Sequence, residues 1–517
     1  MVLAPSSVYF ANPLVYNEGR QTAARLNKRG VHTMHLKTLL AGLSLRSATA
    51  DMEMEITRIS YDSRTTAPGD VFVAMTGFAT DGHAYIGKAV AAGAAAVVCE
   101  RPPEDSSVPY VLVENSRRAL AVMAANYYGH PADSMTMVAV TGTNGKTTTT
   151  YLLKAILEQE LGAKVGLIGT NQDLIGDEVV PTERTTPESL ELQELFARMR
   201  SAGCTHVVME ASSHALALDR VYGIHYAVGI FTNLTQDHLD FHKTMEAYCD
   251  AKAILFQNCD VGVCNADDPW TERLLHQATC RRLLYGCKSA DADLRAEEIS
   301  LAADHVAFAA VTKDAQVPVR VNIPGGFMVY NTLGVLGAAM ALGIPLEQSA
   351  QVLARVPHVK GRVEVVPTPG KDYTILIDYA HSPDGLENVL TSVKGFAKGR
   401  TVAVFGCGGD RDKTKRPKMG AIAARIADFV VVTSDNPRTE EPAAIIADIL
   451  PGLAGTQTPY EVIENRVEAI HYCMDHAQPG DVIVLCGKGH ETYQEIQHVK
   501  HHLDEREIVA EYLAAGH

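Results

Sequence analysis

Short runs of apolar residues alternate with longer stretches of helical spacing along most of the chain, which is the pattern of an α/β protein. In the N-terminal part the pattern predicts helices over 35–43 and 86–95 and strands over 56–60, 71–75 and 96–99. This part ends near residues 130–133, where a proline marks a candidate linker. The alternation of strand and helix predicts an α/β domain here.

The same alternation continues through the middle and the C-terminal part of the chain. The middle predicts a helix over 147–161, closing helices over 330–342 and 346–353, and strands over 137–140, 164–168, 207–209, 228–231 and 260–264. The C-terminal part predicts strands over 374–377, 401–405, 429–433 and 482–485 with helices between them. We therefore predict a tail (1–33) and three α/β domains, which span residues 34–133, 134–357 and 358–517.

Composition narrows the classes of function. The 517 residues include 46 Lys and Arg against 61 Asp and Glu, so the net charge is −15, and a protein built to bind DNA or RNA is excluded. An anionic ligand must be met by local basic clusters. The ten cysteines form no CxxC pair or zinc-site spacing, and no apolar run is long enough to span a bilayer. The first 33 residues lack the features of a secretory signal, so we predict a cytoplasmic protein with reduced thiols.

A glycine-containing segment joins the predicted strand over 137–140 to the predicted helix over 147–161. Its residues are Gly142, Thr143, Asn144, Gly145, Lys146, Thr147 and Thr148. Backbone N–H groups and the positive end of the helix favour a polyphosphate here, where Lys146 would reach the β/γ-phosphates and Thr147 would hold Mg²⁺. The loop is shorter than the common phosphate loop. A strand–helix turn that carries a lysine by chance is the alternative, and the Lys-Thr pair favours the phosphate site.

The form of this loop, and several motifs that follow it in order, resemble the Mur ligases, the ATP-dependent amide-bond-forming enzymes of peptidoglycan precursor synthesis. These motifs are TTPE at 185–188, MEASSH at 209–214, NLTQDHLD at 233–240, AK at 251–252, DYAHSP at 378–383 and GCGGDRD at 406–412. The resemblance runs from about residue 34 to the end. It implies an α/β UDP-binding domain, a central P-loop ATPase domain with a parallel sheet, and a Rossmann-like C-terminal domain.

The resemblance also implies a reaction and its catalytic residues. ATP would phosphorylate the D-glutamate γ-carboxylate of UDP-N-acetylmuramoyl-L-alanyl-D-glutamate, and an incoming amine would attack the acyl phosphate. Glu210 would hold Mg²⁺ together with Thr147, while His238 and Lys252 would hold a second Mg²⁺, with Lys252 as the carbamate formed from CO₂. Lys146 would offset the negative charge. Without the motifs these would be an ordinary strand-end carboxylate, a packed histidine and a helix-surface lysine.

Substrate contacts follow from the same resemblance. The implied contacts to the UDP-muramoyl dipeptide are Tyr61, Ser63, Phe78, Ala79, Thr80, Arg184, Thr185, Thr186, Ser212 and Arg220. Arg220 would pair with a substrate carboxylate. The implied contacts to ATP outside the loop are Asn331, Arg362 and Asp378. The family usually has an asparagine at the position of Met328, so a nucleotide contact at that position is in doubt.

The charged residues of the C-terminal motifs predict which amino acid is the substrate. Asp435-Asn436-Pro437-Arg438 resembles the motif of the branch that adds meso-diaminopimelate instead of L-lysine. Diaminopimelate carries a second carboxylate, which Arg438 and Arg411 could bind by forked hydrogen bonds. Asp435, Asn436 and Glu491 could engage its ammonium groups, and Gly487 permits close backbone approach.

Three other functions compete with this prediction. The L-lysine-adding relatives lack the counterpart of Arg438, and the folate-polyglutamate ligases, which share the phosphate loop, lack the Tyr-Asp-Ser region near residue 61. A nucleotide-gated binding protein without chemistry would have lost Glu210, His238 or Lys252, and all three are present. We predict a monomer that acts on small molecules, with no nucleic-acid partner and no membrane insertion.

Overall fold

The computed structural model describes residues 25–26, 32–77, 80–182, 184–302, 304–357 and 359–515. These residues fall into two compact units, Met1–Tyr127 and Tyr128–His517. The predicted contacts Phe78 and Ala79, and most of the predicted tail, lie outside the described residues. No helix in the described ranges combines the length and the apolar character needed to cross a membrane.

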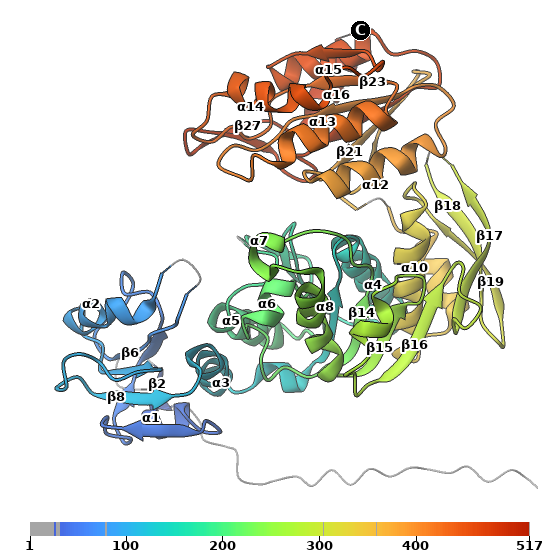
Figure 1. Cartoon of the computed structure of the whole chain (residues 1–517). Helices are drawn as coiled ribbons and strands as arrows, with labels where there is room; N and C mark the ends of the chain where they lie inside the picture. Colours follow the sequence, from blue (N-terminus) through green and yellow to red (C-terminus); the bar gives the residue numbers. More distant parts are fainter. Residues whose placement is uncertain are drawn as a thin grey trace, which may run out of the picture. The chain divides into compact units, whose positions relative to one another are not determined.

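The first unit is built on a five-stranded sheet in the order β3-β8-β7-β6-β5, parallel except for the β3–β8 pair (Figure 1). Its strands are β3 (Leu45–Ala48), β5 (Arg58–Ser60), β6 (Asp70–Val73), β7 (Ala96–Cys99) and β8 (Tyr110–Val113). A smaller sheet holds β1 (Arg25–Leu26), β2 (His32–His35) and β4 (Glu55–Ile56). The helices are α1 (Leu36–Leu39), η1 (Gly82–Tyr85), α2 (Ile86–Ala91) and α3 (Ser116–Tyr128).

Three predicted elements of this unit differ clearly from the structure. The predicted helix over 86–95 ends at Ala91. The predicted helix over 35–43 ends at Leu39, because the chain turns at Gly42 with a φ of +84°, a conformation that glycine adopts without strain. The predicted strand over 56–60 is divided between β4 and β5, which belong to different sheets. Between them the Thr57 N–H donates to the Gly69 carbonyl (3.0 Å). A local turn thus ends the helix predicted over 35–43, whereas tertiary pairing divides the predicted strand.

The second unit contains a mixed sheet of eleven strands in the order β12-β11-β10-β13-β9-β14-β15-β16-β17-β18-β19. The strands are β9 (Thr136–Thr141), β10 (Val165–Ile168), β11 (Asp173–Ile175), β12 (Glu178–Val180), β13 (His206–Glu210), β14 (Tyr226–Phe231), β15 (Cys259–Asn265), β16 (Arg281–Gly286), β17 (Leu294–Leu301), β18 (Val306–Val311) and β19 (Gln316–Val321). The run from β10 to β15 is parallel, as predicted. The parallel strands β16 and β17 and the antiparallel strands at both ends were not predicted.

Helices cover both faces of the parallel part of this sheet. They are η2 (Pro131–Ser134), α4 (Lys146–Leu161), α5 (Ser189–Ser201), α6 (Ser213–Ala217), α7 (Leu239–His242), α8 (Met245–Ala253), η3 (Ile254–Gln257), α9 (Thr271–Leu274), α10 (Phe327–Ala341) and α11 (Leu346–Leu353). Alternate residues of β9 supply the two cores: Val138 and Val140 pack with α4 and α10, whereas Met137 and Ala139 pack with α5 and α8. Figure 1 shows α10 beside the yellow-green β17–β19 ribbon.

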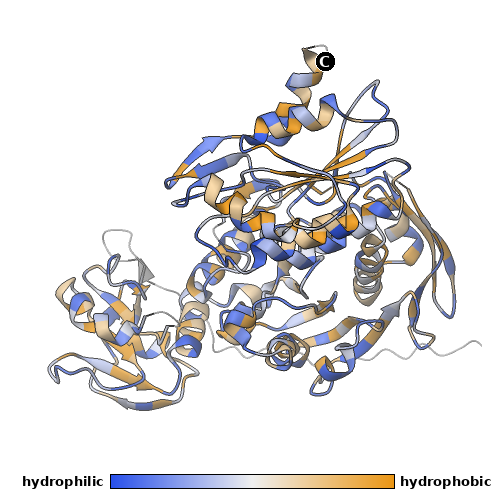
Figure 2. Ribbon diagram, turned by 45° about the horizontal axis from the view of Figure 1, so that its top comes forward, coloured by the Kyte–Doolittle hydropathy of each residue, from blue (hydrophilic) through white to orange (hydrophobic). Residues whose placement is uncertain are grey.

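A second sheet, of six strands, follows in the order β20-β21-β25-β22-β23-β24. Its strands are β20 (Glu364–Val366), β21 (Thr374–Asp378), β22 (Thr401–Phe405), β23 (Phe429–Val432), β24 (Tyr460–Val462) and β25 (Val482–Cys486), and a hairpin of β26 (Tyr493–Ile496) and β27 (Val499–His502) lies outside it. The helices are α12 (Pro383–Lys394), α13 (Lys415–Ile426), α14 (Pro442–Ile449), η4 (Leu450–Gly452), α15 (Arg466–Asp475) and α16 (Glu505–Ala514). Figure 2 shows orange, apolar strands between helices whose other faces are blue and white.

The register of the large sheet positions the first candidate site. Glu210, the last residue of β13, pairs with Val140 of β9, and Phe231, the last residue of β14, pairs with Thr141. The carboxyl ends of three adjacent parallel strands therefore meet at one edge of the sheet. Ligands of open α/β sheets bind at this edge.

Candidate active site

The glycine loop joins β9 to α4, which begins at Lys146, one residue earlier than predicted. Its two glycines have positive φ values, +148° at Gly142 and +88° at Gly145. A Cβ at Gly142 would lie 1.9 Å from the Thr232 hydroxyl, and one at Gly145 would lie 2.3 Å from Asn331 Oδ1. Only glycine fits either position, and the loop wraps closely around the start of the helix.

Neighbouring segments hold the loop in place. The Thr143 N–H donates to the Asn233 carbonyl (2.9 Å), and the Asn144 N–H donates to Asn233 Oδ1 (2.9 Å). The Thr232 hydroxyl donates to the Asn144 carbonyl (2.6 Å). These partners follow β14, so the predicted NLTQDHLD segment supports the backbone of the loop. A backbone that is already ordered presents its N–H groups to an anion at lower entropic cost.

Two lysines meet at the Gly142 carbonyl. Lys146 Nζ donates to it (3.0 Å) and to the Thr143 carbonyl (2.8 Å), while Lys252 Nζ of α8 donates to it from the other side (2.9 Å). Lys252 is 1% exposed and its ammonium lies 4.4 Å from the centre of the Tyr248 ring. Burial, reinforced by repulsion from Lys146, places the pKa of Lys252 well below its ordinary value. Burial also lowers the pKa of Lys146. A buried lysine with a depressed pKa offers a neutral, nucleophilic amine.

Glu210 is a buried carboxylate, 1% exposed, at the end of β13. It accepts hydrogen bonds from the Thr147 hydroxyl (2.9 Å), from the Thr170 N–H (2.9 Å) and from the Thr170 hydroxyl (3.0 Å). Within the described ranges, no lysine, arginine or histidine nitrogen lies within 4.0 Å of this carboxylate. A buried carboxylate beside a hydroxyl, without a cation at pairing distance, is the donor set that suits Mg²⁺.

Within the described residues, no hydrogen bond or ion pair joins His238 to Glu210 or to Lys252. His238 has a left-handed backbone (φ +54°) just before α7, its ring centre is 4.8 Å from that of His214, and its Nε2 is 3.4 Å from Asp237 Oδ2. The third histidine of this group is His242, whose Nε2 is hydrogen-bonded with Ser213 Oγ (2.9 Å). Burial lowers the pKa of His242 to about 4. In the described part of the chain, no three His, Cys, Asp or Glu side chains form a ready metal-binding group.

The predicted dipeptide contacts of the large sheet gather next to Glu210. The Thr186 hydroxyl donates to the Glu210 carbonyl (2.8 Å) and accepts from the Ser212 N–H (3.1 Å), and the hydroxyls of Thr185 and Thr170 are 3.0 Å apart. Arg220 Nη1 donates to the Thr186 carbonyl (3.1 Å), and its Nε is 3.2 Å from the Glu188 carboxylate. The carboxylate that Arg220 pairs with here is therefore one of the protein's own.

The other predicted contacts to the dipeptide substrate are not part of the hydrogen-bonded cluster next to Glu210. Arg184 is exposed, and its backbone N–H and carbonyl engage the Thr182 hydroxyl. Tyr61, Ser63 and Thr80 belong to the first unit, where Ser63 is buried and Thr80 is exposed. Their role as contacts stays a prediction.

The predicted ATP contacts outside the loop lie around Thr147 and β21. Arg362 Nη2 donates to the Thr147 hydroxyl (3.1 Å), and the Arg362 guanidinium lies 5.0 Å from the centre of the Tyr379 ring. The half-buried Asp378 carboxylate accepts from the N–H groups of Val363 and Ala380 (both 2.8 Å). Burial raises the pKa of Asp378, and the charge of Arg362 partly offsets that rise. Arg362 thus connects the phosphate loop to the C-terminal sheet.

A second polar cluster lies at the carboxyl end of β25, formed by the predicted amino-acid contacts. Asn436 Nδ2 donates to Glu491 Oε2 (2.8 Å), and the fully buried Lys488 donates to Asn436 Oδ1 (3.0 Å) and pairs with Glu491 (3.2 Å). Gly487 has a φ of +113°, and a Cβ there would lie 2.3 Å from Asp435 Oδ2. Although burial acts to raise it, the charges of Lys488 and Arg466 hold the pKa of Asp435 below its ordinary value.

The two predicted arginines border the same glycine. A Cβ at Gly408 would lie 2.9 Å from Arg438 Nη1 and 3.8 Å from Arg411 Cγ. Arg438 is mostly buried and donates from Nη1 to the Gly409 carbonyl (2.8 Å), whereas Arg411 is exposed and donates to the Asp410 carbonyl (3.0 Å). The structure therefore places two cations beside carboxylate and amide groups, which suits a ligand that carries both charges.

Comparison with known families now decides what kind of protein this is. Residues 55–128 match the Mur ligase family catalytic domain, residues 140–339 match the Mur ligase middle domain, and residues 361–489 match the Mur ligase glutamate ligase domain. The chain belongs to the Mur ligase family. Its three-domain α/β architecture, predicted from the sequence, is thereby confirmed.

Curated relatives of this Mur ligase share nearly all of its length. A Clostridium botulinum protein is 46% identical over 485 residues, which cover 93% of this chain and 99% of that protein. A Caldanaerobacter subterraneus protein is 47% identical over 483 residues, again 93% and 99%. Both are named UDP-N-acetylmuramoyl-L-alanyl-D-glutamate–2,6-diaminopimelate ligase.

Solved structures agree with the family. A structure of a UDP-N-acetylmuramoyl-L-alanyl-D-glutamate–2,6-diaminopimelate ligase is 31% identical, has a TM-score of 0.67, and matches over 94% of this chain and 99% of the other. The MurF ligase of Thermotoga maritima, solved in complex with ADP, is 22% identical with a TM-score of 0.59, over 89% of this chain and 97% of the other. The second likeness concerns the fold alone.

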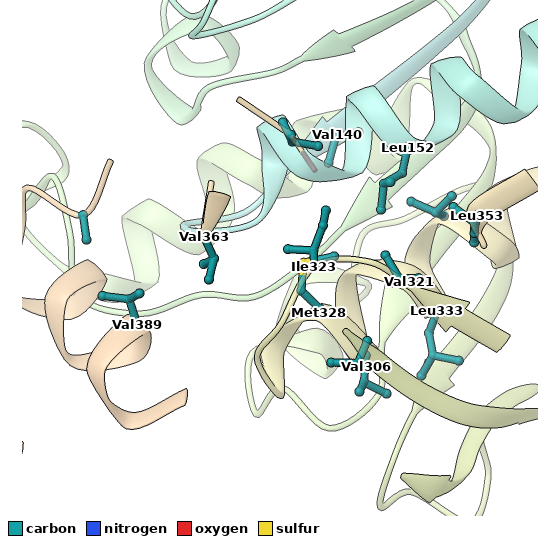
Figure 3. Close-up of a cluster of buried hydrophobic side chains, with 14 of the residues drawn as sticks. Val140, Leu152, Val306, Val321, Ile323, Met328, Leu333, Leu353, Val363 and Val389 are labelled. Carbon is teal, nitrogen blue, oxygen red and sulfur yellow. The ribbon is translucent and has the colours of Figure 1, made fainter. Parts of the chain in front are cut away.

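Met328, where this Mur ligase departs from the usual asparagine, is a core residue. Its side chain is fully buried with Ile323 and Leu333 in the cluster that Figure 3 shows. Asn331, one turn later in α10, keeps its Oδ1 against Gly145 and its Nδ2 near the Met328 sulfur (3.8 Å). Position 328 is therefore part of the hydrophobic core in this chain, while Asn331 faces the loop.

Three residues of the site were missed in the sequence. Thr170 holds both oxygens of Glu210, Tyr248 lies against Lys252 and its hydroxyl is 3.2 Å from that of Thr143, and Lys488 orders the second cluster. Thr170 could have been found, because it follows a predicted parallel strand at the ligand-binding edge. Tyr248 and Lys488 are indistinguishable in sequence from ordinary core and surface residues.

Proposed function

We propose that this Mur ligase adds meso-2,6-diaminopimelate to the D-glutamate of UDP-N-acetylmuramoyl-L-alanyl-D-glutamate, with hydrolysis of ATP to ADP and phosphate, in the synthesis of peptidoglycan precursors. The names of the relatives support this reaction. The observation that carries the choice of amino acid is the placement of Arg438 and Arg411 beside Gly408, next to Asp435, Asn436 and Glu491. L-lysine has no second carboxylate for these arginines.

The reaction needs an activated acyl group, because a carboxylate does not react with an amine in water. A γ-carboxylate oxygen of D-glutamate attacks the γ-phosphorus of ATP in line, and ADP leaves. The amine of diaminopimelate then attacks the acyl carbon, and phosphate leaves as the amide forms. Lys146 offsets the repulsion between the two anions of the first step, and the N–H groups of the loop hold the polyphosphate.

We assign the first Mg²⁺ to Thr147 and Glu210, whose oxygens are 2.9 Å apart. We assign a second Mg²⁺ to His238 and to Lys252 as its carbamate, which the depressed pKa of Lys252 favours. When bound, these ions neutralise charge on the phosphates and on the attacking carboxylate. The structure of the second site depends on the carbamate, because an unmodified lysine amine is no ligand for Mg²⁺.

We propose that each of the three predicted domains binds a different substrate. We assign residues 34–133 to the UDP end of the substrate, residues 134–357 to ATP and the acyl transfer, and residues 358–517 to diaminopimelate. We further propose that the protein works as a cytoplasmic monomer on small molecules. Closure of the C-terminal domain over ATP would bring the amine to the acyl phosphate.

The experiment that tests this function measures ADP release by the purified protein with ATP, Mg²⁺ and the UDP-muramoyl dipeptide. Meso-diaminopimelate and L-lysine are offered in parallel reactions, and the tripeptide product is identified by mass. We expect turnover that depends on diaminopimelate. Turnover with lysine alone would reverse the assignment of the amino acid, and no turnover with either would contradict the ligase reaction.

Replacement of Arg438 by alanine tests the amino-acid pocket. We expect kcat/KM for diaminopimelate to fall by about ten- to several-hundred-fold, because the second carboxylate loses its charge-assisted partner. The matched control is Arg425→Ala, which removes an exposed pair with Glu387 in the same domain and should cost little. Unchanged diaminopimelate kinetics in Arg438→Ala would remove this residue from the site.

Replacement of Gly142 by alanine tests the phosphate loop. The added methyl group would collide with the Thr232 hydroxyl and displace the loop, so we expect ADP affinity to fall by at least about tenfold, or 1.4 kcal/mol. Calorimetric titration with ADP measures the effect. Gly87→Ala is the control, because a Cβ there meets no atom within 4 Å. Equal ADP affinity in both variants would show that the loop does not hold the nucleotide.

A further inference from the structure

Arg438 has a backbone conformation that a non-glycine residue seldom adopts, with φ of +52°. The hairpin of β26 and β27 fixes that conformation from both sides. The Arg438 N–H donates to the Glu495 carbonyl (3.0 Å), and the Arg438 carbonyl accepts from the Gln497 N–H (2.7 Å). Two backbone hydrogen bonds thus compensate for a conformation that would otherwise be strained.

The side chains of Arg438 and Glu495 are also in contact. Arg438 Nε lies 3.2 Å from Glu495 Oε2, and Arg438 Nη1 donates to the Gly409 carbonyl (2.8 Å). The side chains of Arg438 and Glu495 are 19% and 22% exposed, so water screens the pair only in part. The third guanidinium nitrogen, Nη2, forms no hydrogen bond with any of the described residues. The pair therefore fixes the guanidinium while leaving one of its N–H groups for a ligand.

Glu495 reaches the neighbouring residue of the motif as well. Its backbone N–H donates to Asn436 Oδ1 (2.9 Å), the oxygen that also accepts from Lys488. One residue of the hairpin therefore holds both Asn436 and Arg438, through its N–H, its carbonyl and its carboxylate. Among the described residues, Glu495 alone is hydrogen-bonded to the side chains of both Asn436 and Arg438.

We propose that Glu495 is a positioning residue of the diaminopimelate pocket, which orients the Arg438 guanidinium toward the second carboxylate of the amino acid. This inference rests on the proposed function. Arginine has several rotatable bonds, and binding a carboxylate with a free side chain would require those rotations to be lost. Glu495 and Gly409 restrict them before the ligand arrives, which is a gain from preorganisation.

The negative charge of Glu495 acts in the opposite direction, because it repels the same carboxylate. If charge dominates, removing the carboxylate strengthens diaminopimelate binding. If positioning dominates, removing it weakens binding. The direct ion pair and the partial burial favour positioning, so the sign of the effect decides between the two.

Kinetics of the full-length protein test the proposal, with KM and kcat measured separately for diaminopimelate, ATP and the UDP-muramoyl dipeptide. In Glu495→Ala we expect KM for diaminopimelate to rise by about three- to tenfold, with kcat and both other KM values nearly unchanged. Glu495→Gln keeps an oxygen that can accept from Arg438 Nε, so its KM should lie between those of the unmodified protein and Glu495→Ala. Glu461→Gln, an exposed glutamate of β24 in the same domain, is the control.

Each outcome bears on the proposal. The expected rise in KM for diaminopimelate alone, partly restored in Glu495→Gln, supports it. An unchanged or lower KM for diaminopimelate in both variants overturns it. A fall in kcat together with a fall in thermal stability, of the same size in Glu495→Ala and Glu495→Gln, also overturns it. If the unmodified protein turns over the dipeptide with lysine but not with diaminopimelate, the proposed function fails first, and the role of Glu495 fails with it.

Discussion

Replacement of Lys252 by alanine is expected to lower turnover by about 10²–10³-fold, the cost of losing a preorganised group that acts on transition-state charge. Lys252 is buried, contacts the Gly142 carbonyl and has a depressed pKa. In the proposed modification the lone pair of its neutral amine forms a bond to the carbon of CO₂, and one proton leaves to solvent. The carbamate that results is an anion able to hold Mg²⁺.

Steady-state ADP release measures the loss, and Lys313→Ala, at a position where the lysine is 89% exposed, is the matched control. Added formate or acetate should restore part of the turnover of Lys252→Ala, because a small carboxylate can occupy the space of the missing carbamate. The mass of the unmodified protein, recorded in bicarbonate buffer under native conditions, should show the added CO₂. Full turnover in Lys252→Ala would contradict the role of this lysine.

Replacement of Glu210 by glutamine is expected to lower turnover by a similar factor, about 10²–10³-fold, and to raise the Mg²⁺ concentration needed for half-maximal rate. Glutamine is nearly isosteric and can still accept from Thr147 and Thr170, so the fold should persist. What is lost is the buried charge that attracts the cation. This separates a metal-binding role from a structural one.

A magnesium titration of ADP release measures this effect, together with the thermal unfolding midpoint of the variant. Glu194→Gln, an exposed position on α5, is the control and should match the unmodified protein in both measurements. If Glu210→Gln showed the same Mg²⁺ dependence and rate as the control, Glu210 would be a structural carboxylate that only orders Thr147 and Thr170.

Much of the fold could be predicted from the sequence, because many of its elements follow from local patterns of apolar residues and glycines. The buried strand, the glycine turn and the helix around Lys146 follow one another directly in the sequence, and the structure confirms them within one residue. The antiparallel strands β18 and β19 were not predicted, because β18 belongs to the sheet through pairing with β17 and β19 through pairing with β18, and a short run does not reveal its partner.

Positions of single residues were harder to predict. Met328 could be recognised as a departure from the family motif, yet only its packing with Ile323 and Leu333 shows that it lies in the core. The resemblance implies that Arg220 binds a substrate carboxylate, which stays a prediction, and only the structure shows that Glu188 lies 3.2 Å from its Nε. The roles of the site residues toward substrate and metal stay predictions.

By itself the sequence determined the family, the succession of α/β parts and the two groups of charged residues, because these depend on local pattern and on motifs of adjacent residues. Only the tertiary structure decided that Lys146 and Lys252, which are 106 positions apart in the numbering, share the Gly142 carbonyl. It alone placed Glu495 against Arg438. The physical reason is the same in both cases: the pKa of a buried amine and the orientation of a guanidinium depend on neighbours that folding, and not the order of residues, brings within a few ångströms.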